Sequence, residues 1–198
     1  MNATISNKQH PEWGFATIPL PIPDEEYEHC IALLEQLQIG GVTARDCHVE
    51  QIRCGIATLD TLEGQEVNID ELDFLARSIE RYWGNEQPKF EAMAYKLGLK
   101  DVPDLINLSF DCEVTTIIMD FEDLNAAGKD HYMDIHGGGA PVSVLESLDG
   151  EKLIRDLIAT GTGTVTPSGV VFDNDFQLEP HYTGQNFPVY YDKAYRIS

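Results

Sequence analysis

The chain has little positive charge. Its 198 residues include 13 Lys and Arg against 34 Asp and Glu, which gives a formal net charge of −21 at pH 7. Proteins that bind a nucleic-acid backbone or an anionic membrane face need a surplus of Lys and Arg. The composition therefore argues against a nucleic-acid partner and against a membrane partner, and it favours a basic protein as the partner.

Long apolar runs and paired cysteines are also missing. No run approaches the roughly 20 apolar residues that span a bilayer. The first residues, MNATISNKQHPEWGF, lack the basic and apolar regions of a signal peptide. Cys30, Cys47, Cys54 and Cys112 occur singly, without a CxxC pair. We therefore expect a soluble, cytoplasmic protein with reduced thiols and no disulfide scaffold.

Motifs for catalysis and cofactor binding are incomplete. His136 to Gly139 resembles the oxyanion loop of some α/β-hydrolases, but the chain has no GxSxG nucleophile elbow. His131 and His136 lack the spacing of a zinc site. Asp173–Asp175 lacks the later residues of a calcium loop, and Gly161–Thr164 lacks the Walker lysine. We expect no catalytic residues, no metal and no cofactor; a hydrolase stays open only if a Ser or Cys nucleophile lies beside a His.

The negative charge is spread over segments that also carry core patterns. Residues 1–60 have a net charge of −6, residues 61–104 of −5, residues 105–160 of −8 and residues 161–198 of −2. Apolar residues make up 42% of the chain, which is enough for a packed core. The sequence thus predicts a folded scaffold that carries acidic side chains on its surface, and not an acidic tail.

Hydrophobic periodicity predicts a mixed α+β protein. The expected strands cover 15–22, 48–56 and 114–119, with a β-hairpin at 162–172. The expected helices begin at Asp24, Asn68, Pro88, Val102, Asp120 and Val144. Breaks near Gly64 and Cys112 predict three small, closely joined subdomains: an N-terminal α+β part (1–64), a helical middle (65–110) and a C-terminal α+β part (111–198).

Carboxylates gather at the start of three expected helices. Acids in a first turn complement the helix dipole, at about 0.3–1 kcal/mol each, which accounts for any single cluster. The helix dipole does not account for the total excess of acids in the chain, because few Lys or Arg lie near the opposite helix ends. Duplex DNA carries one charge per about 1.7 Å, so −21 matches about 36 Å of duplex. With two neighbouring acids, the predicted partner-binding set is Asp24, Glu25, Glu26, Glu28, Glu63, Glu66, Asp70, Glu71, Asp73, Asp120, Glu122 and Asp123.

Four segments resemble the ArdA-type antirestriction proteins. Asn68–Ala76 followed by Phe90–Ala94 is similar to the family's "(I)-(D/E)-E-L-(N/D)-x-L-A … F-x-A" helical pair. Asp120–Leu124 resembles its "D-x-E-D-(L/Y)" helix start, and Gly150–Leu157 resembles its "x-A-R-D-L" helix before a final hairpin. The resemblance covers roughly residues 15–175, and the two ends of the chain, 1–12 and 179–198, have no clear counterpart.

The resemblance implies an elongated α+β protein of three domains that mimics bent B-form DNA. Such proteins are carried by mobile genetic elements, including conjugative transposons, and form dimers through their C-terminal part. They occupy the basic DNA-binding channel of type I restriction–modification enzymes. We therefore expect a non-catalytic homodimer that inhibits such an enzyme. An acidic adaptor for another basic protein of the same element is the alternative, because composition alone does not separate the two.

Overall fold

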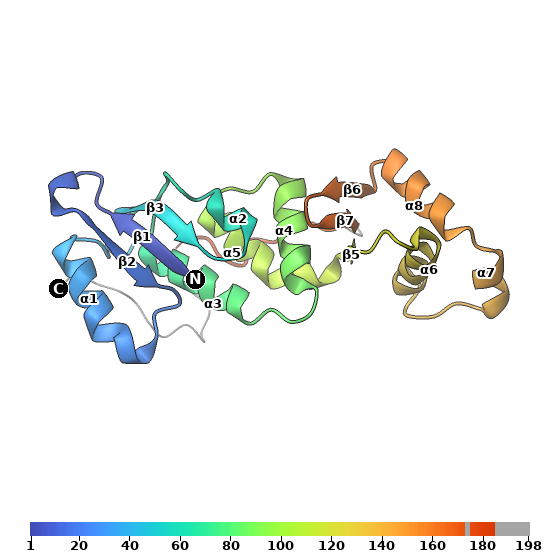
Figure 1. Ribbon diagram of the computed structural model, residues 1–198, viewed down its shortest axis with the longest axis horizontal. Coiled ribbons are helices and arrows are strands. Elements are labelled where there is room, and N and C mark those ends of the chain that lie inside the picture. The colour runs from blue at the N-terminus through green and yellow to red at the C-terminus, as the bar shows by residue number, and fades with distance from the viewer. Residues whose placement is uncertain (173–174, 185–198) are drawn as a thin grey trace. The chain divides into compact units, whose positions relative to one another are not determined.

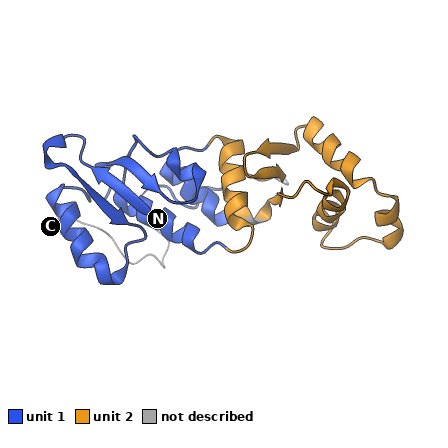
Figure 2. Ribbon diagram, viewed as in Figure 1, with its two compact units in different colours: residues 1–82, 99–110, 179–198 blue, residues 83–98, 111–178 orange. Residues whose placement is uncertain are grey.

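The computed structural model describes residues 1–172 and 175–184 and has an α+β fold (Figure 1). In this part of the chain, eight α-helices accompany two small antiparallel sheets. The chain divides into two compact units (Figure 2). Unit 1 comprises residues 1–82, 99–110 and 179–198, and unit 2 comprises residues 83–98 and 111–178. The α+β expectation is confirmed, while the three subdomains stay a prediction.

Unit 1 is built on a four-stranded antiparallel sheet in the order β2-β1-β3-β4. Its strands are β1 (Asn2–Ser6), β2 (Phe15–Pro19), β3 (Cys47–Arg53) and β4 (Glu66–Val67). The strand expected after Phe15 lies at the sheet edge, where prolines are tolerated. The strand in the first residues was not predicted. β1 pairs with both β2 and β3, so the N-terminal residues are an interior part of this sheet.

Four α-helices accompany the sheet in the described residues of unit 1. They are α1 (Tyr27–Gln36), α2 (Ala57–Asp60), α3 (Ile69–Glu80) and α5 (Val102–Asp111), preceded by the 3₁₀ turns η1 (Pro11–Trp13) and η2 (Asp24–Glu26). Helix α3 is the most deeply placed of them, with nine of its twelve residues buried. Its start is predicted correctly, since the Asn68 side chain accepts hydrogen bonds from the N–H groups of Asp70 and Glu71.

Unit 2 combines a three-stranded sheet with helices. Strands β5 (Thr116–Ile118), β7 (Gly169–Phe172) and β6 (Gly163–Thr166) lie in that order, and α4 (Glu86–Leu97) contacts all three. The 3₁₀ turn η3 (Cys112–Val114) precedes β5. Helices α6 (Leu124–Ile135), α7 (Val142–Ser147) and α8 (Gly150–Ala159) follow. One hydrophobic cluster of the unit consists of Ile118, Ile154, Val170 and Phe172.

Two expected helix boundaries in unit 2 are wrong. The helix predicted to begin at Asp120 starts after Asp123, whose side chain accepts from the Ala126 N–H at 2.9 Å. The helix predicted over 144–159 is two helices, because the Asp149 side chain caps α8 through the Lys152 N–H at 2.9 Å. In the first place two Asp residues close together can each serve as the cap, and in the second a capping Asp lies inside a continuous apolar pattern; apolar spacing alone reveals neither boundary. The hairpin after α8 is confirmed.

Within the described part of the chain, every helix is too short or too polar to cross a lipid bilayer.

Candidate functional site

The first acidic cluster (Asp24, Glu25, Glu26 and Glu28) lies on η2 and the first turn of α1. All four residues are exposed. The prediction that Asp24 caps the helix is wrong: Pro23 occupies the N-cap position of η2, and no side chain caps this turn. Among the described residues, Glu25 and Glu28 form no ion pair. The carboxylates of Glu25 and Glu28 are therefore open to solvent and to a partner.

Glu63 and Glu66 lie in the same unit, near β3. Both are exposed. The Glu63 carboxylate accepts a hydrogen bond from the Ile52 N–H at 2.9 Å, which holds its side chain over the strand. Glu66 belongs to β4, opposite His48. An exposed carboxylate that accepts one backbone hydrogen bond still has lone pairs for a further donor.

The third predicted cluster (Asp120, Glu122 and Asp123) lies before and at the start of α6 in unit 2. All three residues are exposed. Asp120 accepts a hydrogen bond from the Glu122 N–H at 2.8 Å, and Asp123 caps the helix. These local bonds fix two of the three carboxylates, as expected for acids at a helix start, and leave the Glu122 side chain pointing to solvent.

The second cluster (Asp70, Glu71 and Asp73) is buried, unlike the other two. The exposed fractions are 2% for Asp70, 6% for Glu71 and 0% for Asp73. The sequence predicts these three acids at a helix start and as part of the partner-binding set. In the structure Asp73 and Glu71 form hydrogen bonds inside the fold. Their contact with a partner stays a prediction, and in this fold their side chains have almost no exposed surface with which to make it.

Asp73 connects α3 to the segment that leads into the first acidic cluster. Its Oδ1 accepts from the Ile22 N–H at 2.7 Å, and its Oδ2 accepts from the Arg77 guanidinium at 3.3 Å. Ile22 stands two residues before Asp24. One buried carboxylate therefore helps to position the chain that presents the first cluster. The bond spans 51 sequence positions, and no local pattern signals it.

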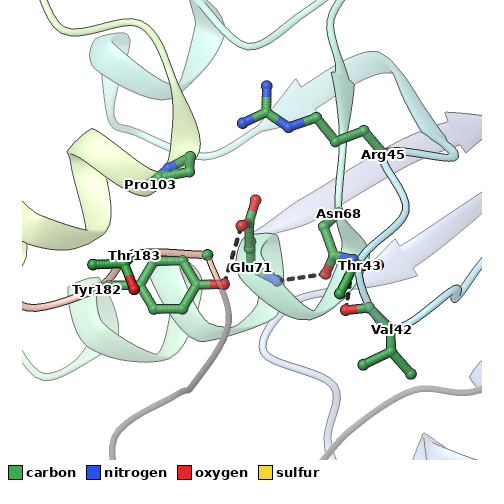
Figure 3. A pocket seen from close by; sticks show the side chains of 9 residues that line it. Val42, Thr43, Arg45, Asn68, Glu71, Pro103, Tyr182 and Thr183 are labelled. Atoms are coloured by element: carbon green, nitrogen blue, oxygen red, sulfur yellow. Dashed lines mark hydrogen bonds between the residues drawn. The ribbon is translucent and has the colours of Figure 1, made fainter.

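Glu71 lies beneath a pocket of about 240 Å³ in unit 1 (Figure 3). Its Oε1 accepts a hydrogen bond from the Tyr182 hydroxyl at 3.0 Å. Its Oε2 is buried and has no hydrogen-bond partner among the described residues. The pocket is lined by Val42, Thr43, Arg45, Asn68, Glu71, Pro103, Tyr182, Thr183 and Gly184.

Tyr182 reaches this pocket because the segment 179–184 returns to unit 1. The Asn107 amide donates to the Tyr182 carbonyl at 3.1 Å and accepts from the Tyr182 N–H at 2.7 Å. The Tyr182 side chain is buried. Sequence reasoning found no role for this tail, whose residues 185–198 lie outside the described part. The one signal was an aromatic residue in an otherwise polar segment.

Burial raises the pKa of Glu71, and the Asp101 carboxylate acts in the same direction. The Tyr182 hydroxyl and the Arg45 guanidinium oppose this rise in pKa only in part. A carboxyl with a raised pKa in the folded state stabilises the fold fully below its unfolded pKa. That contribution is lost as the pH rises through the folded-state pKa.

We therefore expect Glu71→Gln to be more stable than the parent at pH values above the raised pKa of Glu71. A neutral amide avoids the cost of ionising a buried carboxyl, and its oxygen still accepts from Tyr182. The difference should vanish in acid, below the unfolded-state pKa of about 4.3. Urea unfolding of both proteins across this pH range measures it, with the exposed Glu66→Gln as control. Equal stability of Glu71→Gln and the parent at every pH would contradict the expectation.

His131, His136 and the glycines that follow lie in unit 2. His131 is buried against Phe172, with ring centroids 4.1 Å apart, and burial lowers its pKa. His136 follows α6, and its ring donates to the Tyr132 carbonyl at 2.7 Å. Gly137 and Gly138 have positive φ angles, as a turn after a helix requires. Residues 173 and 174 of the calcium-like segment lie outside the described residues. In the described ranges, no three His, Cys, Asp or Glu side chains are placed to hold a metal ion.

Comparison of the chain with protein-family models gives no match, and a search of curated proteins likewise finds none.

Proposed function

We propose that this chain is a non-catalytic antirestriction protein that mimics DNA and occupies the DNA-binding channel of a type I restriction–modification enzyme. One observation carries the proposal: a net charge of −21 on a chain whose packed α+β units leave acidic side chains open to solvent. Glu25, Glu28 and Glu66 form no ion pair with any described residue. When such carboxylates enter a basic channel, they replace the anions bound there. The release of these ions favours binding, as ion release does when DNA binds a protein.

The proposal assigns the contact to nine exposed acids. The carboxylates act together, each near a phosphate position of the DNA that it replaces, and none acts as an acid or base. The nine are Asp24, Glu25, Glu26, Glu28, Glu63, Glu66, Asp120, Glu122 and Asp123. The proposal includes an elongated body of about three subdomains and a homodimer formed through the C-terminal part, as the resemblance to the ArdA-type family implies.

Cleavage of unmodified plasmid DNA by a type I endonuclease tests the proposal. Increasing amounts of the protein should suppress cleavage near stoichiometric ratios, and added salt should weaken the effect, because exposed charges are screened. The acidic adaptor is the second candidate, since it needs the same exposed carboxylates. Duplex DNA should compete with a DNA mimic for the endonuclease. It should not displace an adaptor from its partner. An absence of inhibition with several type I enzymes would move the conclusion to the adaptor.

Neutralising the whole first acidic cluster is expected to weaken inhibition and to flatten its salt dependence. An exposed ion pair contributes about 0–1 kcal/mol, so a single change should alter the inhibitory concentration by less than about fivefold. Four changes together should raise that concentration roughly tenfold to a hundredfold. The variant carries Asp24→Asn, Glu25→Gln, Glu26→Gln and Glu28→Gln, and plasmid cleavage at several salt concentrations measures it.

A control variant separates position from net charge. Glu151 and Asp156 are exposed acids on α8 that already pair with Arg155 and Lys152 at 2.7 and 2.6 Å. Changing both to amides alters the net charge as much as changing two unpaired acids of the first cluster. We expect the control to inhibit nearly as well as the parent. A single first-cluster substitution that abolished inhibition would contradict the distributed contact.

A further inference from the structure

The pocket above Glu71 has the composition of a binding site for a small positively charged group. Its floor is Glu71, a residue with an exposed fraction of only 6%. One of the two carboxylate oxygens of Glu71 has no partner among the described residues. Buried carboxylates almost always have partners, and an exception needs an explanation. In Figure 3 the unpartnered oxygen points away from Tyr182, toward the side of the pocket where Arg45 and Pro103 lie.

Two other polar side chains of the pocket, those of Asn68 and Arg45, are already engaged. The Asn68 amide accepts from two backbone N–H groups and donates to the carbonyls of Gly41 and Ala44 at 3.0 and 2.9 Å. Arg45 pairs with Asp101 at 3.2 Å, and both side chains are about half exposed. Asp101 therefore offsets the charge of Arg45. The carboxylate of Glu71 is the charged acceptor of the pocket that keeps an oxygen without a partner among the described residues.

The size and the walls of the pocket define the rest of the ligand. A volume of about 240 Å³ lies below the roughly 300–1,000 Å³ of pockets that hold drug-sized molecules. Val42, Pro103 and the Tyr182 ring supply apolar walls beside the carboxylate. An alkyl chain of a few carbons fits such walls, and an N–H donor at its end suits the unpartnered oxygen.

We propose that this pocket binds a primary alkylammonium group, whose N–H donors bond to Glu71 Oε2 while its alkyl chain lies between Val42, Pro103 and Tyr182. A quaternary ammonium has the same charge but no N–H, so it does not satisfy this acceptor. The chemistry is shared by a small free amine and by the end of a lysine side chain. The site is independent of the proposed antirestriction function, because it uses none of the nine exposed acids.

Titration of the full chain with n-butylammonium chloride at a series of pH values, followed by calorimetry or NMR, tests the site, because the ammonium group binds the ionised form of Glu71. We expect saturable binding to the parent and to the control Glu66→Gln, and at least tenfold weaker binding to Glu71→Gln. Tetramethylammonium chloride should give no saturable response. Equal binding by Glu71→Gln, or an equal response to tetramethylammonium, would overturn the proposal.

A second variant keeps the test decisive if Glu71→Gln fails to fold. Val42 is exposed at the edge of the pocket, so Val42→Trp should fill the pocket without disturbing the core, and butylammonium binding should be lost. Nα-acetyl-lysine methylamide serves as the lysine probe. Binding of this probe alone assigns the site to lysine side chains, and binding of both probes assigns it to the ammonium group itself. Binding of neither probe refutes the site.

Discussion

Gly128→Ala is expected to destabilise unit 2 by forcing α6 away from α8. The two helices pack against each other (Figure 1), and their backbones meet at glycines. A Cβ atom built on Gly128 would overlap the carbonyl group of Gly150 and come within 2.6 Å of its Cα. A Cβ atom on Gly150 would overlap the carbonyl oxygen of Asn125. Backbone atoms cannot rotate away as a flexible side chain can.

The size and sign of this effect follow from two opposing contributions. Alanine is favoured over glycine inside a helix by about 1 kcal/mol. Overpacking against backbone costs about 1–3 kcal/mol, occasionally more, and here the neighbour is the first residue of another helix. We therefore expect a net loss of about 1–2 kcal/mol, read as a lower urea midpoint and as faster hydrogen exchange in α6.

Gly139→Ala is the matched control for this substitution. A Cβ atom there meets nothing within 4 Å, and the φ angle of Gly139 is not positive. Replacing such a glycine should leave stability unchanged or raise it slightly, because the unfolded chain loses entropy. If Gly128→Ala were as stable as Gly139→Ala, the close approach of α6 to α8 would be refuted.

Local patterns predict most helices and strands of this chain, because those elements depend on neighbours in sequence. Helix α3 combines a capping side chain at Asn68 with an apolar stripe, and both signals agree. The final hairpin follows from two β-branched runs around Pro167 and Ser168. The sequence does not predict strand β1, because its alternation includes only two buried apolar residues, Ala3 and Ile5. So short a pattern is not distinctive.

The division into units is not visible in local patterns. Residues 83–98 belong to unit 2, whereas residues 99–110 and 179–184 belong to unit 1. Contacts between distant segments decide this grouping, such as the pair of hydrogen bonds between Asn107 and Tyr182. The same limit applies to the acidic clusters. Helix position predicts that an acid is near a helix start, but only tertiary partners decide whether it is buried.

The acids of α3 show most clearly that the position of an acid in a helix does not decide whether it is buried. Glu71 stands where a capping box would return its side chain to the N–H of Asn68. It bonds instead to the Tyr182 hydroxyl, 111 positions later. Asp73 lies beyond the first turn of α3, whose acids are Asp70 and Glu71, and it has no exposed surface. Charge counted from sequence therefore overstates the number of carboxylates that a partner can reach.

Asp73→Ala is expected to destabilise unit 1 by about 3 kcal/mol, near the lower end of the cost of breaking a buried ion pair, because the Asp73 side chain is fully buried while that of Arg77 is 24% exposed. The substitution takes from the Ile22 N–H an acceptor at 2.7 Å and from Arg77 a carboxylate at 3.3 Å. Asp73→Asn should cost less, because its oxygen can still accept from Ile22. The exposed Glu66→Gln should change stability by no more than about 0.5 kcal/mol. Urea unfolding of the three variants measures these differences.

The Asp73 variants also separate a positioning residue from a contact residue. If Asp73 acts only inside the fold, Asp73→Asn should inhibit endonuclease cleavage as well as the parent does, at a temperature where both are fully folded. Inhibition should fail only when the variant unfolds, and it should fail together with the loss of folded signal. A folded Asp73→Asn that no longer inhibits would mean that this carboxylate meets the partner directly. That result would require α3 to open on binding, because the Asp73 side chain has no exposed surface in this fold.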